Sequence, residues 1–77
     1  MESSLLAGPG NMLIRYNGEI RDLPDGATVL HLLEALKLPA RQVAVEVNFD
    51  VVPRERHATQ VLQPDDQVEV VTLVGGG

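Results

Sequence analysis

The sequence contains no cysteine and no tryptophan, and its only aromatic residues are Tyr16 and Phe49. Without thiols the chain cannot form disulfides, hold zinc or an iron–sulfur cluster through cysteine, or use a cysteine nucleophile. A small domain without disulfides is typical of the cytoplasm. Because aromatic rings are so few, the core has to be built from valine, leucine and isoleucine side chains.

Long apolar runs and basic clusters are missing as well. No run approaches the roughly 20 apolar residues of a membrane-spanning helix, and no segment has the basic start and apolar middle of a signal peptide. The formal net charge is -5, which repels phosphate backbones and favours basic surfaces on protein partners. We therefore predict a cytoplasmic protein that binds neither nucleic acid nor membranes.

No catalytic or metal-binding motif is present. His31 and His57 are the only histidines; neither belongs to a cluster of ligand-type residues, and His31 is expected to face solvent. Asp65 and Asp66 are adjacent, which suits a turn rather than two carboxylates that flank a cleft. No glycine-rich phosphate-binding loop precedes a helix. We therefore expect no catalytic residues, no metal site and no bound cofactor, and we do not expect an enzyme.

A chain of 77 residues has room for one small domain. Residues 1–11 are rich in serine and glycine and show no periodicity, so we expect a disordered N-terminal extension or leader. Apolar alternation begins immediately afterwards. The domain is therefore predicted to span residues 12–74, followed by a flexible glycine tail over residues 75–77.

The first half of this domain has the pattern of a hairpin followed by a short helix. Alternation begins at Met12, Asn17-Gly18 is the strongest short signal for a two-residue turn, and residues 19–23 return as the second strand. Thr28 suits a helix N-cap, and Pro39 predicts the end of the helix. Four apolar residues recur between them at the spacing of one helix face: Val29, Leu32, Leu33 and Leu36.

The second half has the pattern of strands over residues 42–48 and 68–74, with a short extended piece over 51–53. Residues 54–63 are polar and irregular, with about one helical turn. A helix that crosses from a hairpin to later strands predicts an α+β fold, in which one helix packs across a mixed sheet of four to five strands. The first and last strands are expected to pair in parallel at the centre, as in the β-grasp fold of ubiquitin.

The last strand predicts a docking surface. Glu69 should face water because an unpaired buried carboxylate is costly. Alternation then places Val71 and Leu73 on the same outward face, while Val68 and Val70 point into the core. Exposed apolar side chains beside the end of the chain are typical of a partner-docking face. The alternative is that a loop or the N-terminal extension covers them.

Three glycines, Gly75, Gly76 and Gly77, end the sequence. Glycine has no side chain to pack and loses much conformational freedom in regular structure, so an extended, mobile tail is expected. A tail without Cβ atoms can thread a narrow channel into a partner's active site, which favours enzymatic activation of the Gly77 carboxylate. The alternative is a frayed end without a role.

Taken in order, several stretches of residues 12–77 resemble the ThiS branch of the ThiS/MoaD family of sulfur carriers. The stretches are Asn17-Gly18-Glu19, Asp25-Gly26-Ala27-Thr28-Val29, Val43-Ala44-Val45-Glu46-Val47-Asn48, Val52-Pro53-Arg54 and Val68-Glu69-Val70-Val71-Thr72-Leu73-Val74-Gly75-Gly76-Gly77. Two turns depart from the family pattern. Pro64-Asp65-Asp66 stands where the family often has Gly-Asp, and Phe49 replaces a small or polar residue.

The resemblance implies a ubiquitin-like β-grasp fold and a non-catalytic carrier in thiamine biosynthesis. A ThiF-like adenylyltransferase would use ATP to form an acyl adenylate at Gly77, with Gly75 and Gly76 threaded into its site. Sulfur from a cysteine-desulfurase route would convert this adenylate to a thiocarboxylate, and thiazole synthase would then take the sulfur. Three alternatives stay open: a carrier for molybdopterin or another sulfur metabolite, a ubiquitin-like modifier joined to lysines, and a passive interaction module.

Overall fold

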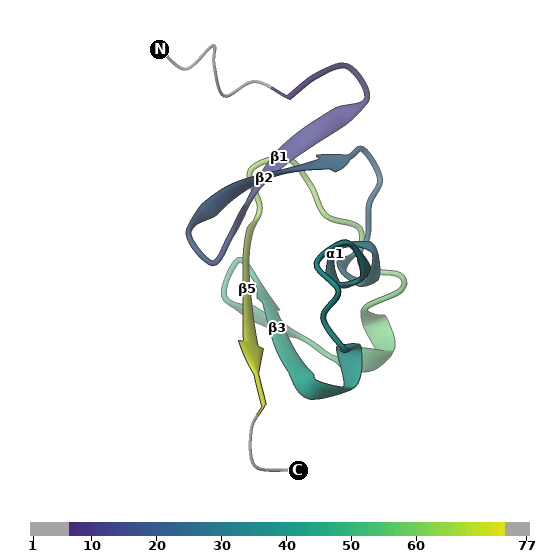
Figure 1. Cartoon of the computed structure of the whole chain (residues 1–77), viewed down its shortest axis with the longest axis vertical. Coiled ribbons are helices and arrows are strands. Elements are labelled where there is room, and N and C mark those ends of the chain that lie inside the picture. The colour runs from purple at the N-terminus through teal and green to yellow at the C-terminus, as the bar shows by residue number, and fades with distance from the viewer. Residues whose placement is uncertain (1–6, 74–77) are drawn as a thin grey trace.

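The computed structural model describes residues 7–73. Five strands form one mixed sheet in the order β2-β1-β5-β3-β4, and helix α1 lies against one face of it (Figure 1). The elements are β1 (Asn11–Tyr16), β2 (Glu19–Pro24), α1 (Val29–Ala35), η2 (Ala40–Gln42), β3 (Val43–Val47), β4 (Asp50–Val52), η3 (Arg54–Arg56) and β5 (Gln67–Thr72). β1 and β5 pair in parallel, whereas the other neighbouring strands are antiparallel. The predicted fold class is therefore confirmed.

Two hairpins turn through two residues with positive φ. Asn17 and Gly18 adopt φ values of 48° and 86°, in the turn that the sequence predicts. Asn48 and Phe49 join β3 to β4 in the same way, with φ values of 51° and 71°. Glycine reaches this region without steric cost, whereas a bulky side chain does not. Phe49 is therefore a strained turn residue, and its hairpin was not evident from the sequence.

The start of α1 carries a reciprocal cap. The Thr28 hydroxyl oxygen accepts the His31 N–H at 3.2 Å, and His31 Nδ1 accepts the Thr28 N–H at 3.0 Å. Each bond satisfies a backbone N–H that would otherwise lack an intrahelical partner. His31 is exposed, as expected, and its ring serves the helix cap.

The helix ends at Ala35, earlier than Pro39 predicts. Lys37 adopts a φ of 59° and donates to the Glu34 carbonyl at 3.0 Å, while Leu38 donates to the Leu33 carbonyl at 2.9 Å. These two bonds form a Schellman motif, which satisfies the last helical carbonyls. The backbone has therefore left the helix before proline could interrupt it.

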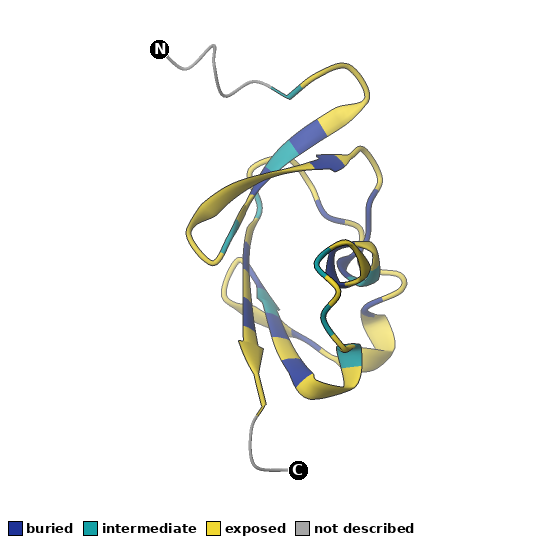
Figure 2. Cartoon of the chain, viewed as in Figure 1, coloured by how far each residue is buried: buried dark blue, intermediate teal, exposed yellow. Residues whose placement is uncertain are grey.

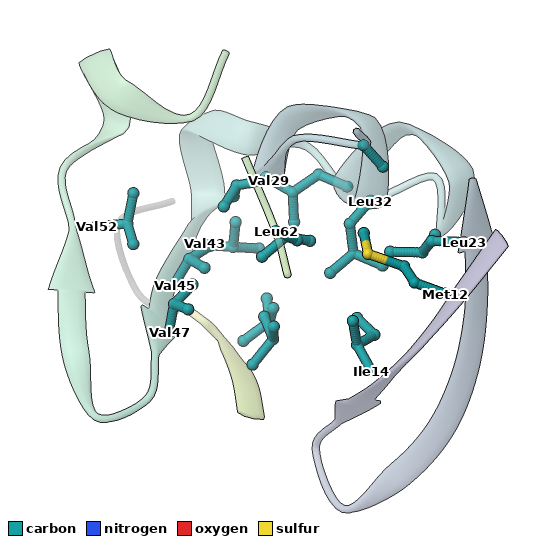
Figure 3. Close-up of a cluster of buried hydrophobic side chains, with 14 residues drawn as sticks. Met12, Ile14, Leu23, Val29, Leu32, Val43, Val45, Val47, Val52 and Leu62 are labelled. Carbon is teal, nitrogen blue, oxygen red and sulfur yellow. The ribbon is translucent and has the colours of Figure 1, made fainter. Parts of the chain in front are cut away.

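The core lies between α1 and the facing side of the sheet (Figure 3). It contains the apolar side chains Met12, Ile14, Leu23, Ala27, Val29, Leu32, Leu33, Val43, Val45, Val47, Val52, Leu62, Val68 and Val70. The alternation predicted for β3 is confirmed, since its three buried residues are valines. The predicted helix face is right for its first three residues, whereas Leu36 is only partly buried against the core.

The segment over residues 54–63 is more buried than its polar sequence suggests. Its predicted helical turn is present as η3, but His57 is only 3% exposed and Leu62 only 1%. His57 Nε2 donates to the Val52 carbonyl at 3.2 Å, whereas Nδ1 has no hydrogen-bond partner among residues 7–73. The buried imidazole thus ties this segment to the edge strand β4.

Candidate functional site

β5 is the middle strand of the sheet and leads to the end of the chain (Figure 1). Its pairing with β1 covers only Gln67 and Val68, whereas its pairing with β3 continues to Thr72. Leu73 N–H then donates to the Gln42 carbonyl at 2.8 Å. The backbone therefore stays bound to the β3 side through the last residue that the structure describes.

Beyond the end of β1, the side chain of Asn17 takes over the hydrogen bonding to β5. Asn17 Oδ1 accepts the Val70 N–H at 2.8 Å, and Asn17 Nδ2 donates to the Val70 carbonyl at 3.1 Å. This amide satisfies both backbone groups of a β5 residue that has no partner in β1. Because these bonds lie one residue before Val71, Asn17 helps to fix the direction in which β5 approaches the chain end.

A second asparagine holds the beginning of β5. Asn48 Oδ1 accepts the Gln67 N–H at 3.0 Å, and Asn48 Nδ2 donates to Asp66 Oδ1 at 3.0 Å. Asp66 Oδ2 in turn accepts the Gln63 N–H at 2.8 Å. The predicted turn role of Asp66 is confirmed, and Asp65 occupies the turn with a φ of 69°, which Asp tolerates better than most residues.

Sequence reasoning missed the contribution of both asparagines to β5. The signal available for Asn17 was its Asn-Gly turn, which predicts the hairpin but not the partner of the amide. That partner lies 53 residues away along the chain. Only the parallel pairing of β1 with β5 brings the two together.

The side chains of β5 alternate as predicted. Val68 and Val70 are 1% and 9% exposed and belong to the core, whereas Val71 and Leu73 are 61% and 55% exposed. Figure 2 shows the end of β5 in the colour of exposed residues. Within the described part of the chain no loop covers Val71 or Leu73.

Strand register extends this exposed surface beyond β5. We call the sheet face directed away from α1 the outer face; over β5, β3 and β4 it comprises Glu69, Val71, Leu73, Ala44, Glu46 and Val51. Val71 lies directly opposite Ala44, and Glu69 lies directly opposite Glu46. Glu46 is in turn opposite Val51, which is 70% exposed. Apolar and acidic side chains thus share one face.

The predicted glycine tail, Gly75 to Gly77, lies outside the described residues. Within residues 7–73, no three His, Asp or Glu side chains gather as ligands for a metal ion. No helix of this same range is long and apolar enough to cross a membrane.

Two hollows of similar volume lie away from the end of β5. One of about 380 Å³ is lined partly by Val51, Arg56 and Val61, beside the edge strand β4. The other, of about 390 Å³, lies between the end of β2 and α1 and is lined partly by Leu23 and His31. Neither set of lining residues contains a serine, threonine, cysteine or lysine that could act as a nucleophile, so the exposed end of β5 is the stronger candidate for a site.

Comparison with known proteins identifies the family to which this arrangement belongs. The family model described as "ThiS family" matches residues 14–77. The sulfur carrier protein ThiS of Escherichia coli is 33% identical over 66 residues, which are 86% of this chain and 100% of that protein. The chain belongs to the ThiS family. Sulfur carrier proteins of this family are non-catalytic, which agrees with the absence of a catalytic motif in the sequence.

Comparison with a solved structure shows that the fold, too, is similar to that of a ThiS protein. The crystal structure of the thiamine biosynthesis protein (ThiS) from Geobacter metallireducens superposes with a TM-score of 0.75 at 33% identity, covering 86% of this chain and 100% of that one. The chain therefore has the ThiS-like β-grasp fold.

Another group of relatives is much longer. The thiazole synthase of Magnetococcus marinus is 46% identical over 66 residues, which make up 86% of this chain but 20% of that protein. The thiazole synthase of Paramagnetospirillum magneticum matches over the same share of its length. The chain thus spans about a fifth of these two relatives, which carry a ThiS-like segment within a larger protein.

Proposed function

We propose that this chain is a sulfur carrier for the formation of the thiazole ring of thiamine. The observation that carries the proposal is its similarity to a sulfur carrier protein ThiS over the whole length of that protein. The geometry of β5 supports it, because this central strand is bound on both sides and leads directly into the glycine tail. The cytoplasm, where ATP and reduced sulfur are available, is the proposed location.

In the proposed reaction the terminal carboxylate of Gly77 carries the cargo. A carboxylate is a poor electrophile, so a ThiF-like adenylyltransferase would join it to AMP from ATP, with release of pyrophosphate. A persulfide formed by a cysteine desulfurase would then displace AMP to give an acyl disulfide, and a thiol reductant would cleave the S–S bond and leave a thiocarboxylate. Thiazole synthase would take this sulfur and return the carboxylate.

The body of the domain would hold the partner while the tail reaches its active site. Gly77 is the fourth residue after Leu73, and four fully extended residues span at most about 14 Å. The surface next to Leu73 therefore has to lie close to the entrance of that active site. Val71 and Leu73 are the proposed contacts at this entrance, and Gly75 and Gly76 are the residues that thread through it.

Intact-mass measurement tests the proposal directly. The full chain is incubated with ATP, a ThiF-like adenylyltransferase, a cysteine desulfurase, cysteine and a thiol reductant. Replacement of one carboxylate oxygen by sulfur is expected, which raises the mass by the difference between the two atoms. Deletion of Gly77 should abolish this gain while leaving the melting temperature within about 1 °C, because the deleted residue follows the last strand.

Other outcomes would assign another role. Isopeptide conjugates to lysines would identify a modifier, whereas delivery of the sulfur only to a molybdopterin precursor would identify a carrier for that pathway. An unchanged mass in the presence of an active adenylyltransferase would contradict a carrier role altogether. Unfolding caused by deletion of Gly77 would show that the tail has a structural role instead.

A further inference from the structure

The two edges of the sheet differ in how far they are closed to a further strand. β4 is three residues long, is followed by Pro53, which has no N–H, and has its Val52 carbonyl bound to His57. β2 is six residues long, and its first four residues are exposed. Natural proteins commonly blunt such an edge, because it is a template for pairing with another chain. β2 is therefore the edge at which a second molecule can add a strand.

The hairpin determines which backbone groups of β2 remain open. In a two-residue hairpin the residues that flank the turn exchange hydrogen bonds, and bonded and non-bonded pairs then alternate along the strands. Tyr16 and Glu19 flank the turn, so Glu19 and Arg21 direct their N–H and C=O groups to β1. Ile20 and Asp22 therefore direct theirs away from the sheet, where an added strand would meet them.

The side chains of β2 select one arrangement for a second copy of the same strand. In an antiparallel pair with two-fold symmetry, the outward backbone groups can place Ile20 opposite Ile20, Ile20 opposite Asp22, or Asp22 opposite Asp22. The second register brings Arg21 opposite Arg21 and the third brings Asp22 opposite Asp22, and like charges in direct opposition are unfavourable. The first register brings Glu19 opposite Arg21, and the symmetry repeats this contact. Only the first register is therefore complementary.

Alternation sorts the contacts of this register onto the two faces of the joined sheet. Glu19 and Arg21 project on the side of the buried Leu23, and Ile20 projects on the opposite side. The Arg21 guanidinium carbon lies 5.6 Å from the centre of the Tyr16 ring, which keeps it on the same face as Glu19. Ile20 is 40% exposed and would be covered by the second copy's Ile20.

We propose that this chain associates with a second copy of itself through β2. The two copies would join edge to edge into one continuous sheet, about a two-fold axis at Ile20. Backbone hydrogen bonds between the two Ile20 residues, their side-chain contact and a reciprocal pair of Glu19–Arg21 contacts would hold them. A second copy is the favoured occupant, because the sequence Glu19-Ile20-Arg21 is complementary to its own reverse.

The proposed contact leaves the end of the chain accessible. Ile20 is paired with Arg15, and Arg15 is paired with Gln67 at the beginning of β5. The tail follows Thr72, which is five residues beyond Gln67, or about 17 Å along a strand. Self-association and sulfur loading are therefore separate properties, and the inference does not depend on the proposed function.

The dimer should be weak. Two short strands bury much less than the roughly 1,200 Å² at which stable interfaces begin, and exposed ion pairs add little. The net charge of -5 on each copy also adds a long-range repulsion, which salt at about 0.15 M screens beyond about 8 Å. At this salt concentration we expect a reversible dimer with a dissociation constant on the order of 100 μM.

Reversal of charge tests this register, with the full chain studied by sedimentation equilibrium up to about 1 mM. Glu19→Arg places an arginine opposite Arg21, and Arg21→Glu places a glutamate opposite Glu19. Each single variant should therefore weaken self-association by about tenfold or more. The double variant Glu19→Arg/Arg21→Glu restores opposite charges and should associate as the wild type does.

A mixture of the two single variants gives the sharpest result. One copy then carries arginine at both positions and the other carries glutamate at both, so only the mixed dimer pairs opposite charges throughout. Native mass spectrometry should show the mixed dimer in excess of either homodimer. Glu19→Arg makes the net charge less negative and Arg21→Glu makes it more negative, so a general effect of net charge cannot weaken self-association in both.

Two control variants reverse charges outside β2. Glu34→Arg and Arg54→Glu carry the same chemical changes at exposed positions, on α1 and on η3. Neither should change the dissociation constant by more than about twofold. Every variant should keep the wild-type melting temperature within about 2 °C and should load sulfur as the wild type does, because the reversed residues are exposed and lie away from the tail.

Hydrogen exchange of the wild-type chain gives a measurement that does not depend on any variant. The Ile20 amide would bond across the interface, so its protection should rise with protein concentration. The Val51 amide is the matched control, because it points outward from the other edge strand in the same way. Its protection should not change with concentration.

A wild-type chain that stays monomeric at about 1 mM would overturn the inference. Self-association that both single variants retain would also overturn it, because another face or register would then join the copies. A mixture without an excess of the mixed dimer would contradict the proposed register. If the chain stays monomeric and the adenylyltransferase protects the Ile20 amide instead, the edge serves that enzyme and the proposal is wrong.

Discussion

Asn17 combines two tasks that different residues commonly perform. Its backbone adopts positive φ in the first hairpin, and its side chain accepts from and donates to Val70 on the central strand. Asparagine suits both tasks, because it tolerates the left-handed region and carries a donor and an acceptor on one planar group. A single residue therefore couples the first turn of the fold to the strand that leads to the tail.

Two substitutions of Asn17 separate these tasks. Asn17→Gly keeps the turn but removes both side-chain bonds, so the free energy of unfolding should fall by about 1–3 kcal/mol. Asn17→Ala should cost about 1 kcal/mol more, since alanine is strained at positive φ. Denaturation in urea measures both values. Equal stability of Asn17→Gly and the wild type would show that the two bonds contribute nothing to the fold.

At the scale of the element, β5 presents two different surfaces along one short strand. Val68 and Val70 fill the core, while Val71 and the following Leu73 are exposed. Alternation alone produces this division, because successive side chains of a strand point to opposite faces. Substitutions on the exposed side of β5 can therefore alter partner binding without altering the core.

Val71→Asp and Leu73→Asp should reduce sulfur loading much more than stability. Each side chain is more than half exposed, so the unfolding free energy should change by about 1 kcal/mol or less. The concentration of carrier needed for half-maximal loading should rise by about tenfold or more. Val68→Ala is the matched change on the buried side and should cost about 2 kcal/mol. Severe destabilisation by Val71→Asp would show that this face is covered.

At the scale of the whole molecule, charge governs encounter more than it governs folding. Six basic residues stand against eleven acidic ones, which leaves a net charge of -5. Such an excess of acidic residues raises the association rate constant with a basic partner surface. It has less effect on the dissociation rate constant of the complex. Electrostatic steering of this kind weakens as salt shortens the screening length.

Association with the adenylyltransferase should therefore slow with ionic strength. Stopped-flow measurements at about 0.02 M and 0.2 M salt should show a decrease of about tenfold in the association rate constant, with a smaller change in dissociation. Replacement of Glu46 and Glu69 by glutamine should flatten this dependence. A rate constant independent of salt would mean that the partner surface is not basic.

Local patterns in the sequence predicted most of the fold and part of the site. Apolar alternation at Met12 and Val43, the helix face that begins at Val29 and the Asn17-Gly18 turn all express geometry that repeats within a few residues. The outward direction of Val71 and Leu73 followed from the same alternation. These features are readable because neighbouring residues alone determine them.

Features that depend on distant residues could not be read in the same way. The burial of His57 and Leu62 has no periodic signal, because an irregular segment is packed against the sheet edge and the helix start by contacts specific to this fold. The end of α1 at Ala35 depends on a Schellman motif with Lys37 in place of the glycine that commonly marks it.

The sequence by itself determined the order of the elements, the family resemblance and the glycine ending that is proposed to carry sulfur. Tertiary structure alone decided that Glu69 faces Glu46, that Val71 faces Ala44, and that the Asn17 amide binds Val70. The physical reason is sheet register. It arises when strands far apart in the chain share one core, and it determines which side chains a partner meets together.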